Sequence, residues 1–508
     1  MTRAHRKKCC DAFDLSQLSI TDDLNLAFDA LVHGKKSSSA SLPDDMEEAL
    51  QRLESEFTIQ SSKLKEIISR FQEELQDGRY FKEYHEHSPM NLTWVMGWPS
   101  GRETGSFLTL DLGGTNLRVC WVELQGRGKE TKLTQDQYKL SDEVKTGDAE
   151  QLWSYVAESL ESFIKKHNIG GASEQPIPFG FTFSYPASQH YIDHGILQTW
   201  TKGLDIKGVE GNDAAAQLRQ AMQERSLPIE LIALINDTTG AMIASAYRDP
   251  QTIAGAIFGT GCNAAYMEQC KSIPKLSNTN MLENQQMAIN CEYGAFDNAH
   301  KVLPRTRYDI QIDQESPRPG EQTFEKLSAG NYMGEIFRLA VVDMHDQGLL
   351  FKNQDISNLR QGYLLDTAFL SQVENDESAA QRVSKDMFKE KVEFEPTTEE
   401  MLFAKRLAIA IATRGARLCT CGIAAICKKT GTTKGHVAAD GSVANKHPHF
   451  KQRWANAMAE VMDWSDDRTE DPITITSAED GSGIGAAIIA AMTMERMKKG
   501  DMVGIQSH

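Results

Sequence analysis

Two segments of the sequence share one layout, in which an apolar run, a glycine-rich turn and a second apolar run follow one another. The segments are residues 108–122, around Asp111-Leu-Gly-Gly-Thr115, and residues 253–267, around Gly259-Thr-Gly261. Each segment predicts two short buried strands joined by a tight turn. Glycine in such a turn lets backbone N–H groups approach an anion closely, because no Cβ stands in the way. One hairpin of this kind also fits an ordinary turn, but two suggest a duplicated fold that holds a phosphate chain from both sides.

A third segment, between these hairpins, places a carboxylate at the end of an apolar strand. The residues Leu234-Ile-Asn-Asp-Thr-Thr239 predict the strand and put Asp237 directly after it. Transfer of a phosphoryl group to an alcohol needs a base that accepts the hydroxyl proton, and Asp237 is the candidate for that base. The spacing alone also fits an aspartate that caps a turn with Thr238 and Thr239 as partners, so both interpretations stay open on this pattern.

Short strands alternate with helices over residues 105–235, which argues for an α/β domain. A helical region with one apolar face is expected from Pro43 to Gly78, with acidic residues in its first turn, where the helix dipole favours them. A long helix is expected over Met401–Lys429. The final strand, Ile473–Thr476, leads into a last helix over Gly485–Lys498.

The chain resembles the hexokinase family, in its eukaryotic glucokinase-like branch. The resemblance covers roughly residues 75–495 and rests on nine segments that occur in the family's order. They are Asp111–Arg118, Phe181–Pro186, Leu197–Gly203, Asn236–Gly240, Gly259–Asn263, Asn290–Phe296, Phe324–Gly330, Ala439–Ser442 and Ala478–Gly483. Two further stretches, Ile289–Asp297 and Ile312–Gly320, look closer to fungal glucokinases than to fungal hexokinases.

The resemblance implies an α/β fold of two lobes with a central cleft, similar to the actin-like, ribonuclease-H-like ATPases. The expected parts are an N-terminal extension (1–44), helices of the large lobe with a connection (45–104), the small lobe (105–235), the large lobe (236–476) and a C-terminal helix that completes the small lobe (477–500). The extension is expected to be loosely ordered; the alternative is a short amphipathic helix that acts as a docking element.

The resemblance also assigns the residues that read the sugar. They are Ser184, Thr201 and Lys202 from the small lobe, and Asn236, Asp237, Asn263, Glu292 and Glu325 from the large lobe. It implies that Asp237 takes the proton from the sugar 6-hydroxyl and that Lys202 stabilises charge developing on the transferred phosphate. Without the resemblance, a single lysine or glutamate would be expected on the solvated surface. Glu292 lies in a stretch with few charges, however, where a carboxylate needs partners.

The nucleotide contacts that the resemblance implies come from both hairpins and from three later segments. They are Asp111, Gly113, Gly114, Thr115, Asn116 and Arg118, then Gly259, Thr260 and Gly261, and finally Gly330, Asn331, Thr367, Ser371, Ser442, Val443 and Lys446. Ala444-Asn445 departs from the family's commoner aromatic or basic residues, which leaves the adenosine contacts less defined. The expected co-substrate is ATP with Mg²⁺. No residue is expected to bind the metal directly, and Asp111 and Asp237 would act through water.

Together these residues predict an ATP-dependent hexose kinase that makes hexose 6-phosphate from glucose, with mannose and fructose as open alternatives. The rival hypothesis is a hexokinase-like sensor or regulatory protein that binds sugar without turnover. Such proteins typically lose a catalytic residue, whereas this chain keeps Asp237, Lys202 and both glycine turns. An actin-like filament protein or chaperone would have no use for the sugar motifs. A monomer or weak dimer is expected.

Composition excludes several other classes. The formal charge of −17, from 54 basic and 71 acidic residues, disfavours general nucleic-acid binding but leaves room for a small anion in a positive cleft. No run approaches the roughly 18 apolar residues of a membrane helix, and the basic N-terminus lacks the apolar region of a secretory signal. Nine cysteines, an odd number, predict reduced thiols. We therefore expect a cytoplasmic protein with no nucleic-acid partner and no membrane insertion.

One motif points elsewhere. Gly481-Ser-Gly-Ile-Gly-Ala486 fits the G-x-G-x-x-[GA] pattern of dinucleotide-binding folds. Such folds need a further strand with an acidic residue about 20 positions later, and none follows before His508. These glycines are instead expected to allow a close helix approach at a hinge. The P-loop pattern G-x-x-x-x-G-K-[ST] does not occur in the sequence.

Overall fold

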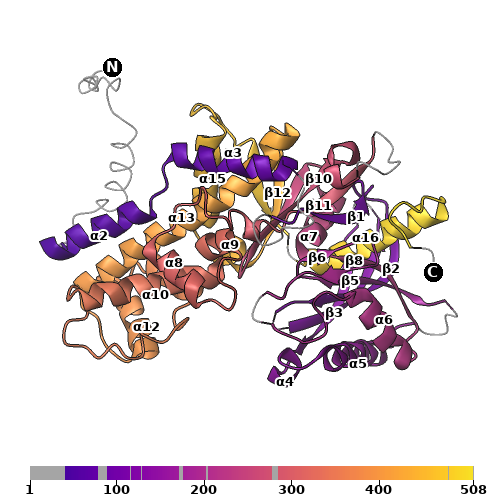
Figure 1. The fold of residues 1–508 in the computed structure, drawn as a ribbon, viewed down its shortest axis with the longest axis horizontal. Coiled ribbons are helices and arrows are strands. Elements are labelled where there is room, and N and C mark those ends of the chain that lie inside the picture. Colours follow the sequence, from indigo (N-terminus) through magenta and orange to yellow (C-terminus); the bar gives the residue numbers. More distant parts are fainter. Residues whose placement is uncertain are drawn as a thin grey trace, which may run out of the picture.

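The structure is a computed structural model that describes residues 41–77, 88–114, 116–126, 129–170, 175–201, 204–276, 284–478 and 480–506. Within these ranges, most strands belong to two sheets that lie in different parts of the molecule (Figure 1). The large sheet adjoins the long helices of the indigo and orange segments, and the small sheet lies beyond it with its own helices. A short third pair joins β6 (Ala187–Ser188) to β7 (Ile196–Leu197).

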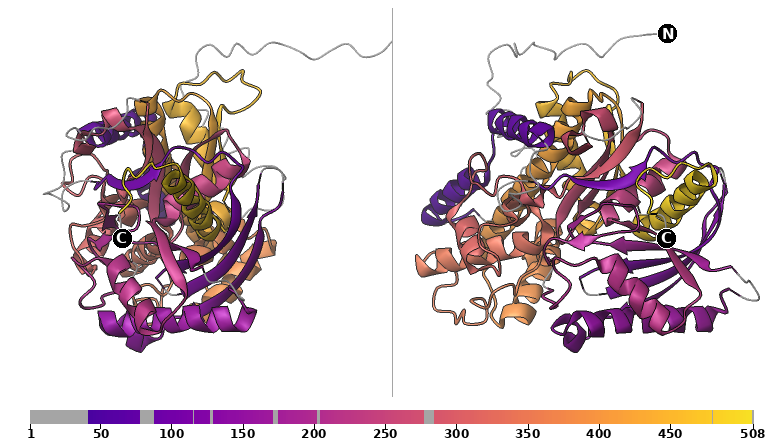
Figure 2. Two further views of the ribbon diagram at one scale, coloured as in Figure 1. Left: turned by 90° about the vertical axis from the view of Figure 1, so that its right-hand side faces the viewer. Right: turned by 45° about the vertical axis from the view of Figure 1, so that its right-hand side comes forward.

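The small sheet has the strand order β4-β3-β2-β5-β8. Its strands are β2 (Thr104–Leu112), β3 (Asn116–Gln125), β4 (Lys132–Lys139), β5 (Ile177–Phe183) and β8 (Ile229–Ile235). β2, β3 and β4 run antiparallel, while β5 and β8 continue the sheet in parallel from β2. One face is covered by α5 (Ala149–His167) and α6 (Ala214–Glu224), preceded by the short α4 (Asp142–Lys145). Figure 2 shows α5 on the face opposite the yellow C-terminal helix, α16 (Gly481–Lys498).

The large sheet repeats this plan. Its order is β1-β11-β10-β9-β12-β13, formed by β1 (Asn91–Met96), β9 (Thr252–Phe258), β10 (Cys262–Gln269), β11 (Gln286–Asn290), β12 (Gly435–Asp440) and β13 (Ile473–Ser477). β9, β10 and β11 run antiparallel, β12 and β13 continue in parallel from β9, and β1 adds one edge strand. Both glycine-rich segments are therefore the first hairpin of a sheet, which confirms the duplicated fold expected from them.

The two repeats are joined through a pair of helices. α7 (Asp237–Arg248) follows β8, the last strand of the small sheet, and α16 follows β13, the last strand of the large sheet. The two helices lie against each other, and α16 also packs on β2, β5 and β8 of the small sheet (Figure 1). Helix α16 begins at Gly481, four residues earlier than expected, because the glycine run is itself helical where it meets α7.

The remaining helices build the body of the large lobe. They are α2 (Asp44–Phe57), α3 (Ser61–Asp77), α8 (Arg307–Glu315), α9 (Thr323–Ser328), α10 (Gly330–Asp346), α11 (Thr367–Asn375), α12 (Arg382–Val392), α13 (Thr398–Thr430), α14 (Ser442–Lys446) and α15 (Phe450–Val461), with 3₁₀ turns η1 (Cys270–Ser272), η2 (Pro274–Leu276), η3 (Tyr293–Ala295) and η4 (Ala379–Gln381). The N-terminal helical region is confirmed, but it divides into α2 and α3 at residues 58–60, where Thr58 is extended. The extension at residues 1–40 lies outside the described residues.

The long helix α13 is the central element of this body. A capping box at Thr397 and Glu400 begins it, and Gly431, in the left-handed conformation, ends it. Its length and composition are those of a helix that could cross a membrane, yet 78% of the apolar window is buried inside the structure. This is the pattern of a core helix, since α2, α3, α11 and α15 all pack on α13.

Candidate active site

Each glycine-rich turn is closed by a backbone hydrogen bond. In the β2–β3 turn, the Gly113 N–H donates to the Asn116 carbonyl at 3.1 Å; in the β9–β10 turn, the Gly259 N–H donates to the Gly261 carbonyl at 3.0 Å. Gly113 and Gly114 are half-buried, whereas Asn116 and Thr260 are exposed. Thr115 lies outside the described residues. Both turns are thus the tight hairpins that the sequence predicts.

The carboxylate of Asp111, at the end of β2, is held by a polar cluster. Arg118 pairs with Asp111 across the hairpin, and its Nη2 lies 3.1 Å from Asp111 Oδ2. The Ser482 hydroxyl donates to the same oxygen at 2.6 Å, and the Ser184 hydroxyl donates to Oδ1 at 3.3 Å. Arg118 also reaches Asp480 at 2.6 Å. The cluster therefore fixes Asp111 and ties the first hairpin to the start of α16.

Asp237 is the first residue of α7, two positions after the end of β8. Asn236 caps the helix, with its side-chain oxygen accepting from the Thr238 N–H at 2.9 Å, and Asp237 Oδ1 accepts from the same N–H at 2.8 Å. Asp237 Oδ1 also accepts from the Thr238 hydroxyl at 3.2 Å, so Asn236 and Asp237 both cap this turn and the role of Asp237 as the base stays a prediction. The Asp237 carboxylate is half-buried. Burial, followed by the negative charge of Asp237, raises the pKa of Asp440.

A network of amides lies beside Asp237. Asn263 Nδ2 donates to Asn290 Oδ1 at 2.7 Å, and Asn290 Nδ2 donates to Glu292 Oε1 at 2.8 Å. Asn236 Nδ2 reaches the same Glu292 oxygen at 3.4 Å. Asn236 and Asn263 are buried, while Glu292 is half-buried. Planar amides and a carboxylate are thus clustered next to the candidate base, as recognition of neighbouring hydroxyl groups requires.

The structure describes three of the other predicted sugar residues. Glu325 lies on α9, and its Oε2 accepts from the Cys262 N–H at 3.1 Å, directly after the second glycine turn. Ser184, after β5, is buried and contacts Asp111, whereas Thr201 is half-buried. Lys202 lies outside the described residues, so its position stays a prediction.

Several predicted nucleotide residues meet at the second hairpin. The Gly330 N–H donates to the Gly259 carbonyl at 2.8 Å, and the Asn331 N–H donates to the Thr260 carbonyl at 3.2 Å. The Thr367 hydroxyl donates to the Gly330 carbonyl. This brings the start of α11 against the start of α10, which in turn contacts the hairpin.

The segment that leads into helix α14 also contacts the second hairpin. Gly441, before α14, has φ +107°, and a Cβ there would stand 2.6 Å from the Phe258 backbone, so only glycine fits. The Val443 side chain is buried against Gly330, which makes it a packing residue here. Ser442 and Lys446 are exposed and Ser371 is half-buried, and the contacts of these three residues with a nucleotide stay a prediction.

Four polar residues of the site did not appear among the sequence candidates, namely Asn290, Asp440, Asp480 and Ser482. Asp440 ends β12, and Asp480 precedes α16. Asp237 was predicted because a carboxylate there follows an apolar strand. The same pattern occurs at Asp440, within the motif Ala439–Ser442. This pattern occurs twice because the fold is duplicated, and each repeat places polar residues at the ends of its parallel strands.

The site is compatible with a metal that arrives with the nucleotide. Within the described residues, no group of three or more His, Cys, Asp or Glu side chains is placed to hold a metal ion. Asp111, Asp237 and Asp440 each lie at or near the end of a strand, and burial and then the charges of Asp111 and Asp237 raise the pKa of Tyr185. Separate carboxylates of this kind suit contacts to a hydrated Mg²⁺.

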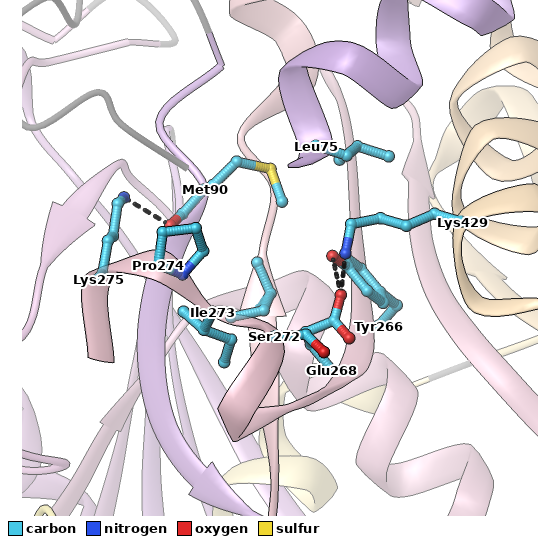
Figure 3. Close-up of a pocket in the computed structure, with 10 residues that line it drawn as sticks. Leu75, Met90, Tyr266, Glu268, Ser272, Ile273, Pro274, Lys275 and Lys429 are labelled. Carbon is cyan, nitrogen blue, oxygen red and sulfur yellow. Dashed lines mark hydrogen bonds and ion pairs between the residues drawn. The ribbon is translucent and has the colours of Figure 1, made fainter. Parts of the chain in front are cut away.

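A small pocket elsewhere in the large lobe is distinct from this site. It is lined by Leu75, Met90, Tyr266, Ser272 and Ile273, among others, beside the ion pair of Glu268 with Lys429 (Figure 3). Lys275 turns to the Met90 carbonyl at 2.8 Å. The charged groups of this pocket are thus engaged with each other or with backbone, and none belongs to the candidate active site.

Comparison with known proteins identifies the family. Sequence models of hexokinase match residues 49–247 and 253–492. The hexokinase of Emericella nidulans is 50% identical over 474 residues, which cover 93% of this chain and 96% of that protein. Hexokinase-2 of Saccharomyces cerevisiae is 47% identical and covers 93% of this chain and 97% of that protein. The chain belongs to the hexokinase family.

A solved structure agrees with this assignment. The hexokinase of Schistosoma mansoni in complex with glucose superposes with a TM-score of 0.79 at 30% identity, over 88% of this chain and 99% of that one. The expected two-lobed, actin-like fold is thus confirmed. Both of these fungal relatives carry the name hexokinase, so they lend no support to the finer expectation of a glucokinase-like branch.

Proposed function

We propose that this hexokinase transfers the γ-phosphoryl group of ATP to the 6-hydroxyl of a hexose, with glucose as the foremost substrate and Asp237 as the base. One observation carries the proposal: Asp237 lies at the start of α7 beside the network formed by the amides of Asn236 and Asn263 and the carboxylate of Glu292. A hydroxyl bound by these amides would lie within reach of the carboxylate, which is the geometry that proton abstraction needs.

The other residues are proposed to position the phosphate chain. The backbone N–H groups of the two glycine turns would bind phosphate oxygens, and Lys202 would offset the charge that develops on the transferred group. Bound Mg²⁺ would neutralise phosphate charge, with Asp111 and Asp237 contacting it through water. The start of α11 and α14 would border the adenosine, where Thr367, Ser371, Ser442 and Lys446 are the candidate contacts.

Cellular location and assembly are proposals as well. A cytoplasmic protein is supported by the seven cysteines within the described ranges, all of which are buried free thiols. A monomer or weak dimer is proposed on the sequence expectation alone. Sedimentation of the purified protein across a concentration series tests the latter, and a stable tetramer would contradict it.

The test of the proposed function is a coupled assay of ADP release with glucose, mannose, fructose and no sugar, run on the wild type and on Asp237→Asn. ADP should form only with sugar, and fastest with glucose. The substitution should lower turnover at least ~10²-fold, because a positioned base is lost, while glucose binding by calorimetry changes far less, since asparagine is nearly isosteric. A wild type that binds glucose but releases no ADP would establish the sensor hypothesis. A variant with half the wild-type turnover would remove Asp237 from the mechanism.

A further inference from the structure

An ion pair joins the two lobes away from the site residues described above. Arg318 lies in the loop between α8 and α9 of the large lobe, and its Nη2 stands 2.7 Å from Oε1 of Glu210 in the small lobe. The two residues are 108 positions apart in sequence, and each side chain is 37% exposed.

On the large-lobe side, the loop that carries Arg318 is anchored. The Lys326 ammonium, 4% exposed, donates to Asp313 Oδ1 at 2.7 Å and to the Arg318 backbone carbonyl at 2.9 Å. The Gly320 N–H donates to the same Asp313 oxygen at 3.0 Å. Lys326 directly follows Glu325 on α9, so the loop is fixed to the helix that carries a proposed sugar contact.

On the small-lobe side, Glu210 holds the segment that precedes Lys202. Its Oε1 also accepts from the Trp200 backbone N–H at 2.5 Å. The Trp200 ring is buried, donates from its indole N–H to the Ile206 carbonyl at 3.0 Å, and packs edge-on against Tyr185 at 4.7 Å. The backbone at Trp200 is thereby fixed immediately before Thr201 and Lys202.

We propose that Arg318 and Glu210 form an inter-lobe latch, in which two positioning residues stabilise the sugar-bound, closed arrangement and hold the backbone at Trp200 and Thr201 toward the large lobe. The proposal rests on the proposed function, since it assumes a sugar bound by both lobes. A ligand or contact that stabilises one arrangement shifts the population toward it. An exposed ion pair suits a latch that must open in every catalytic cycle, because such pairs are weak.

Substitutions can remove each partner of the latch separately. Glu210→Gln removes the charge but keeps an oxygen for the Trp200 N–H, and Arg318→Ala removes the other partner. Each should weaken glucose binding by about two- to fivefold, the range that an exposed ion pair supports, and raise the glucose KM without changing the ATP KM. Glu210→Ala also removes the Trp200 acceptor, so kcat should fall as well.

The test is calorimetric glucose binding to the wild type, Arg318→Ala, Glu210→Gln and the double variant, at low and high salt. The double variant should be no weaker than either single variant, because both remove the same pair. Salt should weaken glucose binding to the wild type more than to Arg318→Ala. Arg360→Ala is the matched control, because Arg360 forms a comparably exposed pair with Asp346 inside the large lobe; it should bind glucose as the wild type does.

Two results would overturn the latch. One is unchanged glucose affinity in Arg318→Ala, and the other is full additivity of the two single effects. Calorimetry needs no turnover, so these results are independent of the ADP assay. A protein that binds glucose without releasing ADP would refute the proposed function, and the latch would still be tested by the glucose affinities of the variants.

Discussion

The backbone at Glu292 shows how closely single residues of the site are constrained. Glu292 has φ +51°, a left-handed conformation that residues other than glycine seldom adopt. Its N–H donates to Asn263 Oδ1 at 2.9 Å, and its carboxylate accepts from Asn290. The neighbours thus impose a conformation that is unfavourable in isolation, as is common at functional sites.

We expect Glu292→Gln and Glu325→Gln to raise the glucose KM more than the ATP KM. A hydrogen bond from a sugar hydroxyl to a charged acceptor is worth roughly 1.5–3 kcal/mol, and a neutral amide recovers only part of it. Steady-state kinetics with each substrate varied in turn measure the difference. Glu315→Gln, at an exposed position of α8, is the control and should leave both constants unchanged. Equal effects of the site substitutions on both KM values would make Glu292 and Glu325 structural residues.

Site residues could be predicted from the sequence where a carboxylate or a glycine-rich turn follows an apolar strand, as at Asp237 and in the two hairpins. Asp480 was missed because it becomes part of the site only when the chain after β13 reaches Arg118 on β3, whereas Asp440 has a local signal in the motif Ala439–Ser442. The engagement of Arg118 with Asp480 could not be predicted either, because it joins residues 362 positions apart. Pair contacts of this range depend on the tertiary fold alone.

Among the elements, α7 and α16 make the most demanding contact. A Cβ added to Gly485 on α16 would lie 2.2 Å from the Gly240 carbonyl oxygen on α7, whereas at Gly483 the nearest atom would be 3.4 Å away. The glycines of the apparent dinucleotide motif therefore allow close helix packing, as the sequence predicted, while the hinge role stays a prediction.

Gly485→Ala should accordingly destabilise the protein. Backbone atoms cannot move aside as a side chain can, and overpacking typically costs about 1–3 kcal/mol. Gly483→Ala on the same helix should be neutral or stabilising by up to about 1 kcal/mol, through the better helix propensity of alanine. Urea unfolding of both variants measures the difference. Equal stability of the two would mean that the helices are not in close contact in solution.

Elements with strong periodicity were predictable, and those defined by tertiary pairing were not. Both hairpins and α13 follow from local apolar patterns, and α13 spans Thr398–Thr430 against the expected Met401–Lys429. The strand expected at Leu234 was also found as β8, but it begins earlier, at Ile229. β1 was not predicted, since its place at the edge of the large sheet depends on pairing with β11, about 200 residues away. The break between α2 and α3 was also missed, because Leu53, Phe57 and Leu64 all face one core across it.

At the scale of the whole molecule, the N-terminal segment is expected to be dispensable for catalysis. The family models begin at residue 49, and α2 is anchored from Asp44 onward by the ion pairs of Arg406 with Glu47 and Glu54. Deletion of residues 2–40 should therefore leave kcat/KM within about threefold of the value for the full chain. None of the site residues named above, and none of the residues that hold them in place, lies in this segment. A truncated protein that folds, by circular dichroism, but lacks activity would place the segment in the catalytic body.

The central claim is that one site is shared by two lobes and completed when the sugar closes them. Ser184 and Thr201 come from the small lobe, whereas Asn263, Glu292 and Glu325 come from the large lobe, so a hexose that contacts both sets binds the closed arrangement better. Closure would also exclude water, which competes as a phosphoryl acceptor. The most direct measurement is small-angle X-ray scattering with and without saturating glucose, with binding verified by calorimetry. The radius of gyration should fall with glucose and fall less with ATP alone. An unchanged scattering profile with glucose demonstrably bound would contradict the account.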